Sequence, residues 1–203
     1  MILPAAEGDL KAEKQALRRS MSERRQALSA HEVRRASEAI CARALALIAQ
    51  RDVRTVALYA AIRNEVALGS LDAALRARGV AIAYPRVASA TEIRFHLVAG
   101  PAELAPAGRY LIPEPPPTAP LAEPAALDVI MVPALAFDRR GYRLGWGAGY
   151  YDALLAQAPR ALRIGVCYDF QLVERCPHGT GDQPVSVVAT EDRSICVTEE
   201  DTP

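Results

Sequence analysis

The sequence lacks the features that mark nucleic-acid-binding, membrane and secreted proteins. Its 203 residues carry no excess charge of either sign, with 24 Lys plus Arg against 24 Asp plus Glu, so no long-range field draws the chain to nucleic acid or an anionic membrane. No apolar run approaches the length of a membrane-spanning helix, about 18 residues. The first residues, MILPAAEGDLK, lack the basic start and long apolar centre of a signal peptide. We therefore expect a cytoplasmic, monomeric protein whose partners are small molecules, not nucleic acid or a membrane.

Motifs built on cysteine and histidine are also missing. The four cysteines include no CxxC pair, and the chain has only three histidines. A zinc site needs closer ligand spacing than this, so no metal–thiolate site is expected. We expect the cysteines to be reduced and structural. The chain also shows no Ser/His/Asp or Cys/His arrangement for nucleophilic catalysis.

The pattern that is present is that of an α/β protein. With 51% apolar residues, a chain of this length can bury the core of one domain, which we expect to span residues 1–203. Amphipathic helices are predicted over about 8–50, the second opened by the capping box Ser29-x-x-Glu32. Short apolar segments alternating with helices predict a mostly parallel open sheet with helices on both faces. The predicted strands cover residues 53–60, 80–84, 93–98, 127–137, 162–168, 185–189 and 194–198.

One segment has no clear period. Residues 100–124 contain eight of the 15 prolines, and they predict an irregular excursion over the surface.

A glycine-rich stretch is the most distinctive part of the chain. Residues 141–152, GYRLGWGAGYYD, hold four of the 12 glycines, three of the seven tyrosines and the single tryptophan. The apolar run 127–137 precedes this stretch and a short helix over 153–158 follows it. A loop between a strand and a helix N-terminus gathers free backbone N–H groups and the positive end of the helix dipole, which suits phosphate. The GxGxG spacing lacks the lysine of a P-loop and the third glycine of GxGxxG, so a tight surface turn remains the alternative.

Charged side chains elsewhere are further candidates. Lys14 lies close to the apolar stripe of the first predicted helix, and Arg18 follows one turn later. Glu65 comes just after the first predicted strand, and ligands bind at the carboxyl ends of strands in open parallel sheets. The alternatives are that Lys14 extends its ammonium group to water and that Glu65 is a solvated loop residue.

Several blocks together resemble one family. Residues 132–155, VPALAFDRRGYRLGWGAGYYDALL, resemble the signature of the 5-formyltetrahydrofolate cyclo-ligase family, also called methenyltetrahydrofolate synthetases. KQALR at 14–18 and YAAIRNEV at 59–66 are similar to two further motifs of that family. Weaker similarities cover YPRV at 84–87, EP at 114–115, and DQPV and VATE between 182 and 191. The blocks occur in family order from about residue 10 to 195.

The resemblance implies an enzyme that binds ATP, Mg²⁺ and 5-formyltetrahydrofolate and forms 5,10-methenyltetrahydrofolate. In the family, phosphoryl transfer activates the formyl oxygen, N10 closes the ring and phosphate leaves. Phosphoryl transfer mainly needs positioning and charge neutralisation, which cations, a helix N-terminus and Mg²⁺ can supply.

The resemblance also implies roles for individual residues. The implied ATP contacts are Lys14, Arg18, Arg143, Gly145, Trp146, Gly147, Ala148, Gly149, Tyr150 and Tyr151. The implied folate contacts are Tyr59, Glu65, Tyr150 and Tyr151, and the implied magnesium ligands are Asp152 and Asp182. Arg143 and Tyr151 are the expected catalytic residues. Without the resemblance, Asp152 could equally be a favourable charge at a helix start, and Arg143 a solvated loop cation.

The chain departs from the family pattern at two positions. Ser186 stands where the family usually has an aspartate, four residues after Asp182, and Trp146 stands where tyrosine or a basic residue is commoner. Ser186 supports the alternative hypothesis of a catalytically weakened relative that binds ATP or folate. Trp146 is expected to alter one wall of the nucleotide site.

Overall fold

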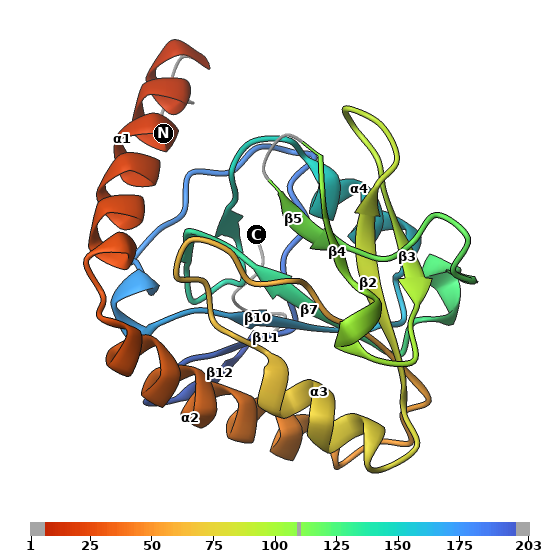
Figure 1. The fold of residues 1–203 in the computed structure, drawn as a ribbon. Helices are drawn as coiled ribbons and strands as arrows, with labels where there is room; N and C mark the ends of the chain where they lie inside the picture. The colour runs from red at the N-terminus through yellow and green to blue at the C-terminus, as the bar shows by residue number, and fades with distance from the viewer. Residues whose placement is uncertain (1–6, 109–110, 198–203) are drawn as a thin grey trace.

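The computed structural model describes residues 7–108 and 111–197, and a sheet of eight strands forms the centre of this part of the chain (Figure 1). The strand order is β12-β11-β10-β7-β1-β2-β3-β6. The parallel strands are β1 (Thr55–Ala57), β2 (Ala81–Val87), β7 (Val129–Pro133), β10 (Leu162–Val166) and β11 (Val187–Ala189). The antiparallel strands at the two edges are β3 (Ile93–Leu97), β6 (Leu121–Ala122) and β12 (Ser194–Cys196).

Both faces of the sheet are covered. Successive residues of β7 point to opposite faces: Val129 and Met131 join one buried cluster, whereas Ile130 and Val132 join the other. Helices α2 (Ala30–Ile48) and α3 (Gly69–Arg76) pack on the first face, and α4 (Tyr150–Gln157) packs on the second (Figure 1). The predicted α/β class, with a mostly parallel sheet between helices, is confirmed.

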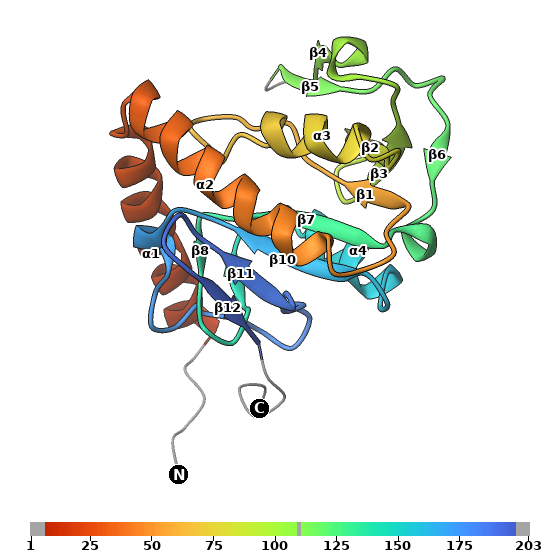
Figure 2. The same ribbon diagram turned by 90° about the horizontal axis from the view of Figure 1, so that it is seen from below.

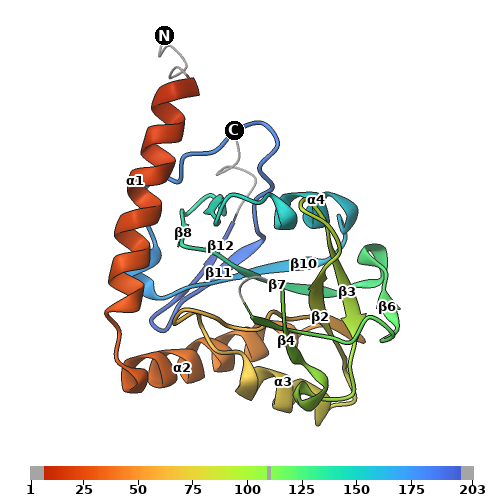
Figure 3. The same cartoon turned by 45° about the horizontal axis from the view of Figure 1, so that its top comes forward.

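Helix α1 (Glu7–Gln26) packs elsewhere, against a small hairpin. Its apolar stripe, including Leu17 and Met21, packs in one cluster with Leu135 and with Leu144 of the hairpin formed by β8 (Ala136–Phe137) and β9 (Arg143–Leu144). Figure 3 shows α1 alongside β8, at one end of the sheet. The predicted capping box at Ser29 then opens α2. None of the described helices has the length and hydropathy needed to cross a bilayer.

Two strand predictions need correction. The apolar run 127–137 is not one strand, because β7 ends at Pro133 and the chain then turns into the β8–β9 hairpin. The glycine-rich loop therefore follows a hairpin and not a long central strand. In addition, β2 continues through Pro85. Its neighbour β1 pairs with β2 only as far as Ala83. At Pro85 there is therefore no β1 residue opposite, and the missing N–H of proline breaks no hydrogen bond between the two strands.

The proline-rich segment 100–124 is more ordered than predicted. Strands β4 (Ala105–Ala107) and β5 (Ile112–Glu114) pair with each other, and β6 joins the edge of the main sheet (Figure 2). Short 3₁₀ helices lie at Pro101–Glu103, Pro124–Ala126 and Asp169–Gln171. The predicted strand end at residue 198 lies outside the described residues.

Candidate active site

The glycine-rich loop connects β9 to the start of α4. Gly147 and Gly149 have φ angles of 104° and 75°, a region that L side chains rarely adopt. Gly149 is the N-cap of α4 and supplies no side-chain hydrogen bond, so the first amides of the helix point toward the loop without a capping side chain. Arg18 of α1 donates from Nε to the carbonyl oxygen of Gly145 at 2.9 Å. The loop is thus held against α1 and presents N–H groups and a helix N-terminus.

Lys14, one turn before Arg18, bonds a carboxylate from the far end of the chain. Its Nζ lies 3.0 Å from Oδ2 of Asp182, and the Gly179 amide donates to the same oxygen at 2.9 Å. Burial raises the pKa of Asp182, but the Gly179 amide and Lys14 outweigh it, so the pKa falls below its ordinary value. The structure therefore brings together a predicted phosphate contact and a predicted metal ligand.

Arg143 links the start of α4 to the loop that carries Asp182. Its Nη2 lies 2.6 Å from Oδ1 of Asp152, and Nη1 donates to the carbonyl oxygen of Gln183. The Gln183 amide donates to the same Asp152 oxygen at 2.9 Å. The Arg143 side chain is only 6% exposed and belongs to β9, so the alternative of a solvated loop cation is wrong.

The two aspartates can be tested as magnesium ligands from their hydrogen bonds. Each receives its contacts at one oxygen, Oδ1 of Asp152 and Oδ2 of Asp182. Among the described residues, no hydrogen bond reaches the second oxygen of either carboxylate, Oδ2 of Asp152 and Oδ1 of Asp182. Neither of these two second oxygens is a buried atom that lacks a partner. The same part of the chain contains no group of three or more His, Cys, Asp or Glu suited to a metal ion. Mg²⁺ takes one or two carboxylates and fills its other positions with water and phosphate, so this pair fits it.

Glu65 is buried, which rules out the alternative of a solvated loop residue. Arg63 and Asn64 adopt positive φ angles of 49° and 57° just before it. Glu65 is 8% exposed, and Oε2 accepts the Ile62 amide at 3.1 Å. Burial raises its pKa above the ordinary value, although Arg25, the Ile62 amide and a hydrogen bond with Trp146 oppose that rise.

The loop that carries Glu65 is fixed to the end of α1. The side-chain Nδ2 of Asn64 donates to the carbonyl oxygens of Arg25 and Leu28 at 3.2 and 3.1 Å. The Tyr168 hydroxyl donates to the backbone carbonyl oxygen of Asn64 at 3.0 Å. Arg25 itself donates from Nε to the backbone carbonyl oxygen of Arg63 and from Nη1 to that of Ala134. These contacts hold Glu65 in one position relative to α1.

Arg25 is a residue of this site that was not among the candidates predicted from the sequence. It is 1% exposed and lies four residues after Met21 and three before Leu28, on the same apolar stripe as Lys14. An arginine on a buried stripe was the signal that could have identified it.

The three tyrosines predicted to bind substrate differ in their surroundings. Tyr59 is buried, and its hydroxyl donates to the Val66 carbonyl at 2.8 Å. Tyr151 lies within electrostatic reach of Glu65 and Arg143; burial, then Glu65, raises its pKa, and Arg143 opposes the rise. The Tyr151 phenol thus stays protonated at neutral pH. Tyr150 is partly exposed, and its hydroxyl donates to the carbonyl oxygen of Ser89 at 3.3 Å.

The two departures from the family pattern have different consequences. Trp146 is 45% exposed and lies against the guanidinium groups of Arg63 and Arg25, whose Cζ atoms are 5.0 and 5.6 Å from its ring centre. It thus covers the Glu65 region with an aromatic ring, at a position where the family more often has tyrosine or a basic residue. The Ser186 side chain accepts the Arg163 amide at 3.3 Å, and the contacts that orient Asp182 come from other residues.

The fold and the site together define a class of protein. A mostly parallel sheet covered by helices, with charged groups gathered on the loops around its carboxyl edge, is the architecture of α/β proteins that bind small ligands there. The chain belongs to the 5-formyltetrahydrofolate cyclo-ligase family, whose model matches residues 10–191. The predicted family is confirmed, and with it the expectation of an enzyme.

Similar proteins agree with this membership. A 5-formyltetrahydrofolate cyclo-ligase of Mycoplasma pneumoniae is 32% identical over 162 residues, 78% of this chain and 87% of that protein. The Saccharomyces cerevisiae enzyme of the same name is 30% identical over 208 residues, 91% of this chain and 98% of that protein. The structure of Aquifex aeolicus 5,10-methenyltetrahydrofolate synthetase matches with a TM-score of 0.80 at 36% identity, covering 92% of this chain and 93% of that one. The Mycoplasma pneumoniae synthetase structure matches with a TM-score of 0.73 at 28% identity, covering 88% of this chain and 98% of that one.

Proposed function

We propose that this protein uses ATP and Mg²⁺ to convert 5-formyltetrahydrofolate into 5,10-methenyltetrahydrofolate. The observation that carries the proposal is the continuous set of contacts from Lys14 through Asp182 and Gln183 to Asp152 and Arg143. It surrounds the glycine-rich loop with cations and two carboxylates that each have an oxygen without a hydrogen bond from the described residues. This is the charge arrangement that phosphoryl transfer requires.

The chemistry explains why phosphate is needed. The formyl oxygen of the substrate is amide-like, and oxide is a poor leaving group. Transfer of the γ-phosphoryl group to that oxygen releases ADP and gives a phosphorylated imidate-type carbon. N10 then attacks this carbon to close the ring, loses its proton, and the C–O bond breaks. The formyl oxygen therefore leaves as part of inorganic phosphate.

The residues around the loop would act on the phosphates. The amides of the loop and the N-terminus of α4, with Arg18 and Lys14, would bind the phosphate oxygens and hold the γ-phosphoryl group in place. Asp152 and Asp182 would hold Mg²⁺, which would neutralise charge on the phosphates. Arg143 is buried beside Asp152, and it would keep that carboxylate oriented and stabilise charge that develops during transfer.

Glu65 and the tyrosines would bind the folate. The Glu65 carboxylate would accept hydrogen bonds from N–H groups of the pterin ring. Tyr151, which remains protonated, would donate a hydrogen bond near the reacting formyl oxygen, between Glu65 and Arg143. Tyr59 has its hydroxyl bonded within the protein, so its role would be to pack the wall behind the pterin.

Product formation tests this proposal. Purified protein is mixed with 5-formyltetrahydrofolate, ATP and Mg²⁺, and the absorbance of the methenyl product is followed, with ATP or Mg²⁺ omitted in parallel. We expect product only in the complete mixture and none with Asp152→Ala. Tight folate binding by calorimetry without any turnover would contradict the proposal and favour a catalytically weakened relative. The expected cytoplasmic location and monomeric state remain part of this proposal, and size-exclusion chromatography with light scattering tests the second.

A further inference from the structure

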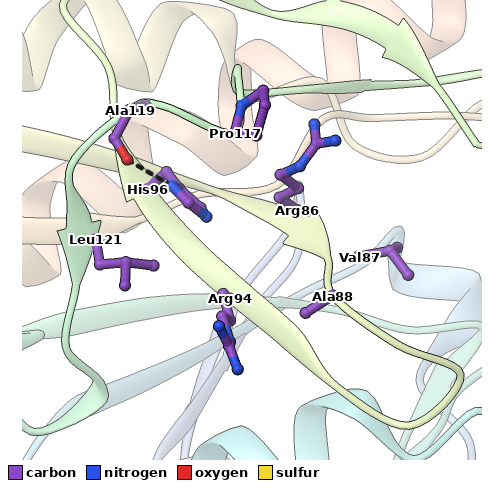
Figure 4. Close-up of a pocket in the computed structure, with 8 residues that line it drawn as sticks. All are labelled: Arg86, Val87, Ala88, Arg94, His96, Pro117, Ala119 and Leu121. Carbon is purple, nitrogen blue, oxygen red and sulfur yellow. Dashed lines mark hydrogen bonds between the residues drawn. The ribbon is translucent and has the colours of Figure 1, made fainter.

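The proposed magnesium ligand Asp182 lies at the end of an open loop, residues 176–182, with the sequence CPHGTGD. Residues 179–181 are exposed, and two of the three are glycines, so the backbone before Asp182 can adopt many conformations. A cleft of about 660 Å³ lies between the β2–β3 pair and the segment before β6 (Figure 4), and none of the loop residues lines it. The position of Asp182 therefore depends on the contacts that hold this loop.

The chain is bonded to the turn between β8 and β9 at the start of the loop and just after its end. The buried Asp138 carboxylate accepts the Cys176 amide at 3.0 Å through Oδ2 and the Tyr142 amide at 3.1 Å through Oδ1. After the loop, the Val185 amide donates to the Gly141 carbonyl oxygen at 3.0 Å. The turn thus anchors the chain on both sides of the exposed glycines.

Between these two anchors, a pair of aromatic rings holds the loop. The His178 ring stacks on the Tyr142 ring, with centroids 3.7 Å apart and an angle of 6° between the planes. Tyr142 is itself buried in the cluster beneath α1. His178 directly precedes Gly179, whose amide donates to Oδ2 of Asp182, and the Asp182 amide donates back to the Gly179 carbonyl oxygen at 3.2 Å. The stack is thus one residue away from the bonds that orient the carboxylate.

His178 contributes a neutral ring and not a charge. Burial, followed by the neighbouring Arg140, lowers its pKa, and Asp138 and Asp182 oppose this fall. The imidazole is therefore uncharged at neutral pH and is not another cation for the phosphates. Its contribution is the flat surface that it places against Tyr142.

The stack and the contacts of Gln183 hold the chain on opposite sides of Asp182. After Asp182, Gln183 is bonded to both Arg143 and Asp152. Before it, the His178 ring rests on the turn that leads into β9. Mg²⁺ demands near-ideal octahedral geometry, so a carboxylate ligand on a glycine-rich loop has to be fixed from both directions.

We propose that His178 is a positioning residue for magnesium binding, which acts by holding Gly179 and Asp182 in place through its stack on Tyr142. This inference rests on the function proposed above, in which Asp182 holds Mg²⁺. His178 acts through Asp182 and does not itself bind the metal.

Amide hydrogen exchange tests the inference without metal or substrate. Exchange of the Gly179 amide is measured by NMR in the wild type, His178→Ala and His178→Phe. We expect it to be about two- to tenfold faster in His178→Ala, the size that one aromatic pair provides. His178→Phe keeps a flat ring and should stay close to the wild type. The control, His31→Ala, at the exposed start of α2, should leave the exchange unchanged.

A magnesium titration tests whether the effect reaches the reaction. The Mg²⁺ concentration for half-maximal activity should also rise about two- to tenfold in His178→Ala, with an unchanged KM for 5-formyltetrahydrofolate, and His178→Phe should restore it. In an Asp182→Asn background, His178→Ala should have no further effect on the titration, because the carboxylate that it positions is already gone.

The outcomes separate this role from the proposed function. An unchanged Gly179 exchange in His178→Ala, an unchanged magnesium titration, or an equal effect with and without the Asp182 carboxylate would each overturn the inference. A lower melting temperature with an unchanged titration would show that the stack only stabilises the fold, and would also overturn it. Absence of product with the wild type would instead contradict the proposed function, and the Gly179 exchange would still decide whether the stack holds the loop.

Discussion

Nη2 of Arg25 lies 3.5 Å from Oε1 of Glu65, with both side chains almost fully buried. This Nη2 is also a buried nitrogen without a hydrogen bond among the described residues, so its main interaction there is the charge of Glu65. Helix α1 carries Arg25, Arg18 and Lys14 on one side. A single helix thus fixes both the proposed folate carboxylate and the proposed phosphate cations.

Replacing Arg25 should make the stability of the protein depend on pH. Arg25→Met leaves the Glu65 charge buried without its partner, a change that costs about 3–5 kcal/mol. The pKa of Glu65 is already raised, and the substitution raises it further. A group whose folded-state pKa is raised loses its stabilising contribution as pH rises from the unfolded value, about 4.3, through the folded one. The Arg25→Met defect should therefore be larger at pH 8 than at pH 5.

Urea unfolding at the two pH values measures this difference. Arg24→Met is the matched control, because Arg24 lies on the same helix turn, is exposed, and contacts Phe170 instead of Glu65. A defect in Arg25→Met that is equal at both pH values would show that packing, not the Glu65 charge, is what was lost.

Lys14→Gln should weaken the use of ATP. One charge-assisted hydrogen bond contributes about 1.5–3 kcal/mol, so the KM for ATP should rise roughly ten- to hundredfold. The KM for 5-formyltetrahydrofolate should change far less. The control is Lys11→Gln, which removes the chain's only other lysine, exposed on the same helix. An equal rise in the KM for both substrates would contradict the assignment of Lys14 to the phosphate site.

Asp182→Asn should raise the Mg²⁺ concentration needed for half-maximal activity. The amide keeps the shape of the side chain but lacks the negative charge that Mg²⁺ prefers. Asp182 is a cleaner test than Asp152, whose carboxylate also pairs with the buried Arg143. Asp192→Asn, at an exposed aspartate, should leave the Mg²⁺ titration unchanged. An unchanged titration in Asp182→Asn as well would exclude Asp182 as a ligand.

Gly147→Ala should impair the phosphate loop, whereas Gly145→Ala should not. At Gly147 the φ angle is 104°, and an added Cβ would lie 3.3 Å from Nη2 of Arg18. Holding a residue with a side chain in such a backbone region costs about 1–3 kcal/mol. At Gly145 no atom lies within 4 Å of an added Cβ and φ is not positive. Thermal unfolding and the KM for ATP compare the two variants, and equal effects would contradict the importance of this backbone geometry.

Local signals in the sequence were enough for much of the fold. Ser29 and Glu32 lie three residues apart and determine the start of α2 without help from distant residues. Successive residues of β7 are buried on opposite faces of the sheet. A continuous apolar run in the sequence indicates a strand that is buried in this way. These features depend on neighbours in the chain, so a single sequence is sufficient to find them.

The remaining features depend on distant residues. The β8–β9 hairpin turns at Asp138, whose buried carboxylate accepts amides of Tyr142 and Cys176, and the second of these lies 38 residues away. Arg25 is stable at a buried position only because Glu65, Arg63 and Ala134 meet it there. The order of motifs predicted the residues that gather around the loop, but it could not show that Lys14 and Asp182 bond each other.

The fate of the formyl oxygen tests the proposed reaction most directly. The substrate is labelled with ¹⁸O in its formyl group, turned over with ATP and Mg²⁺, and the released inorganic phosphate is analysed by mass spectrometry. Phosphoryl activation predicts one ¹⁸O atom in phosphate for each methenyl product formed. Unlabelled phosphate, with the ¹⁸O recovered in water, would contradict it.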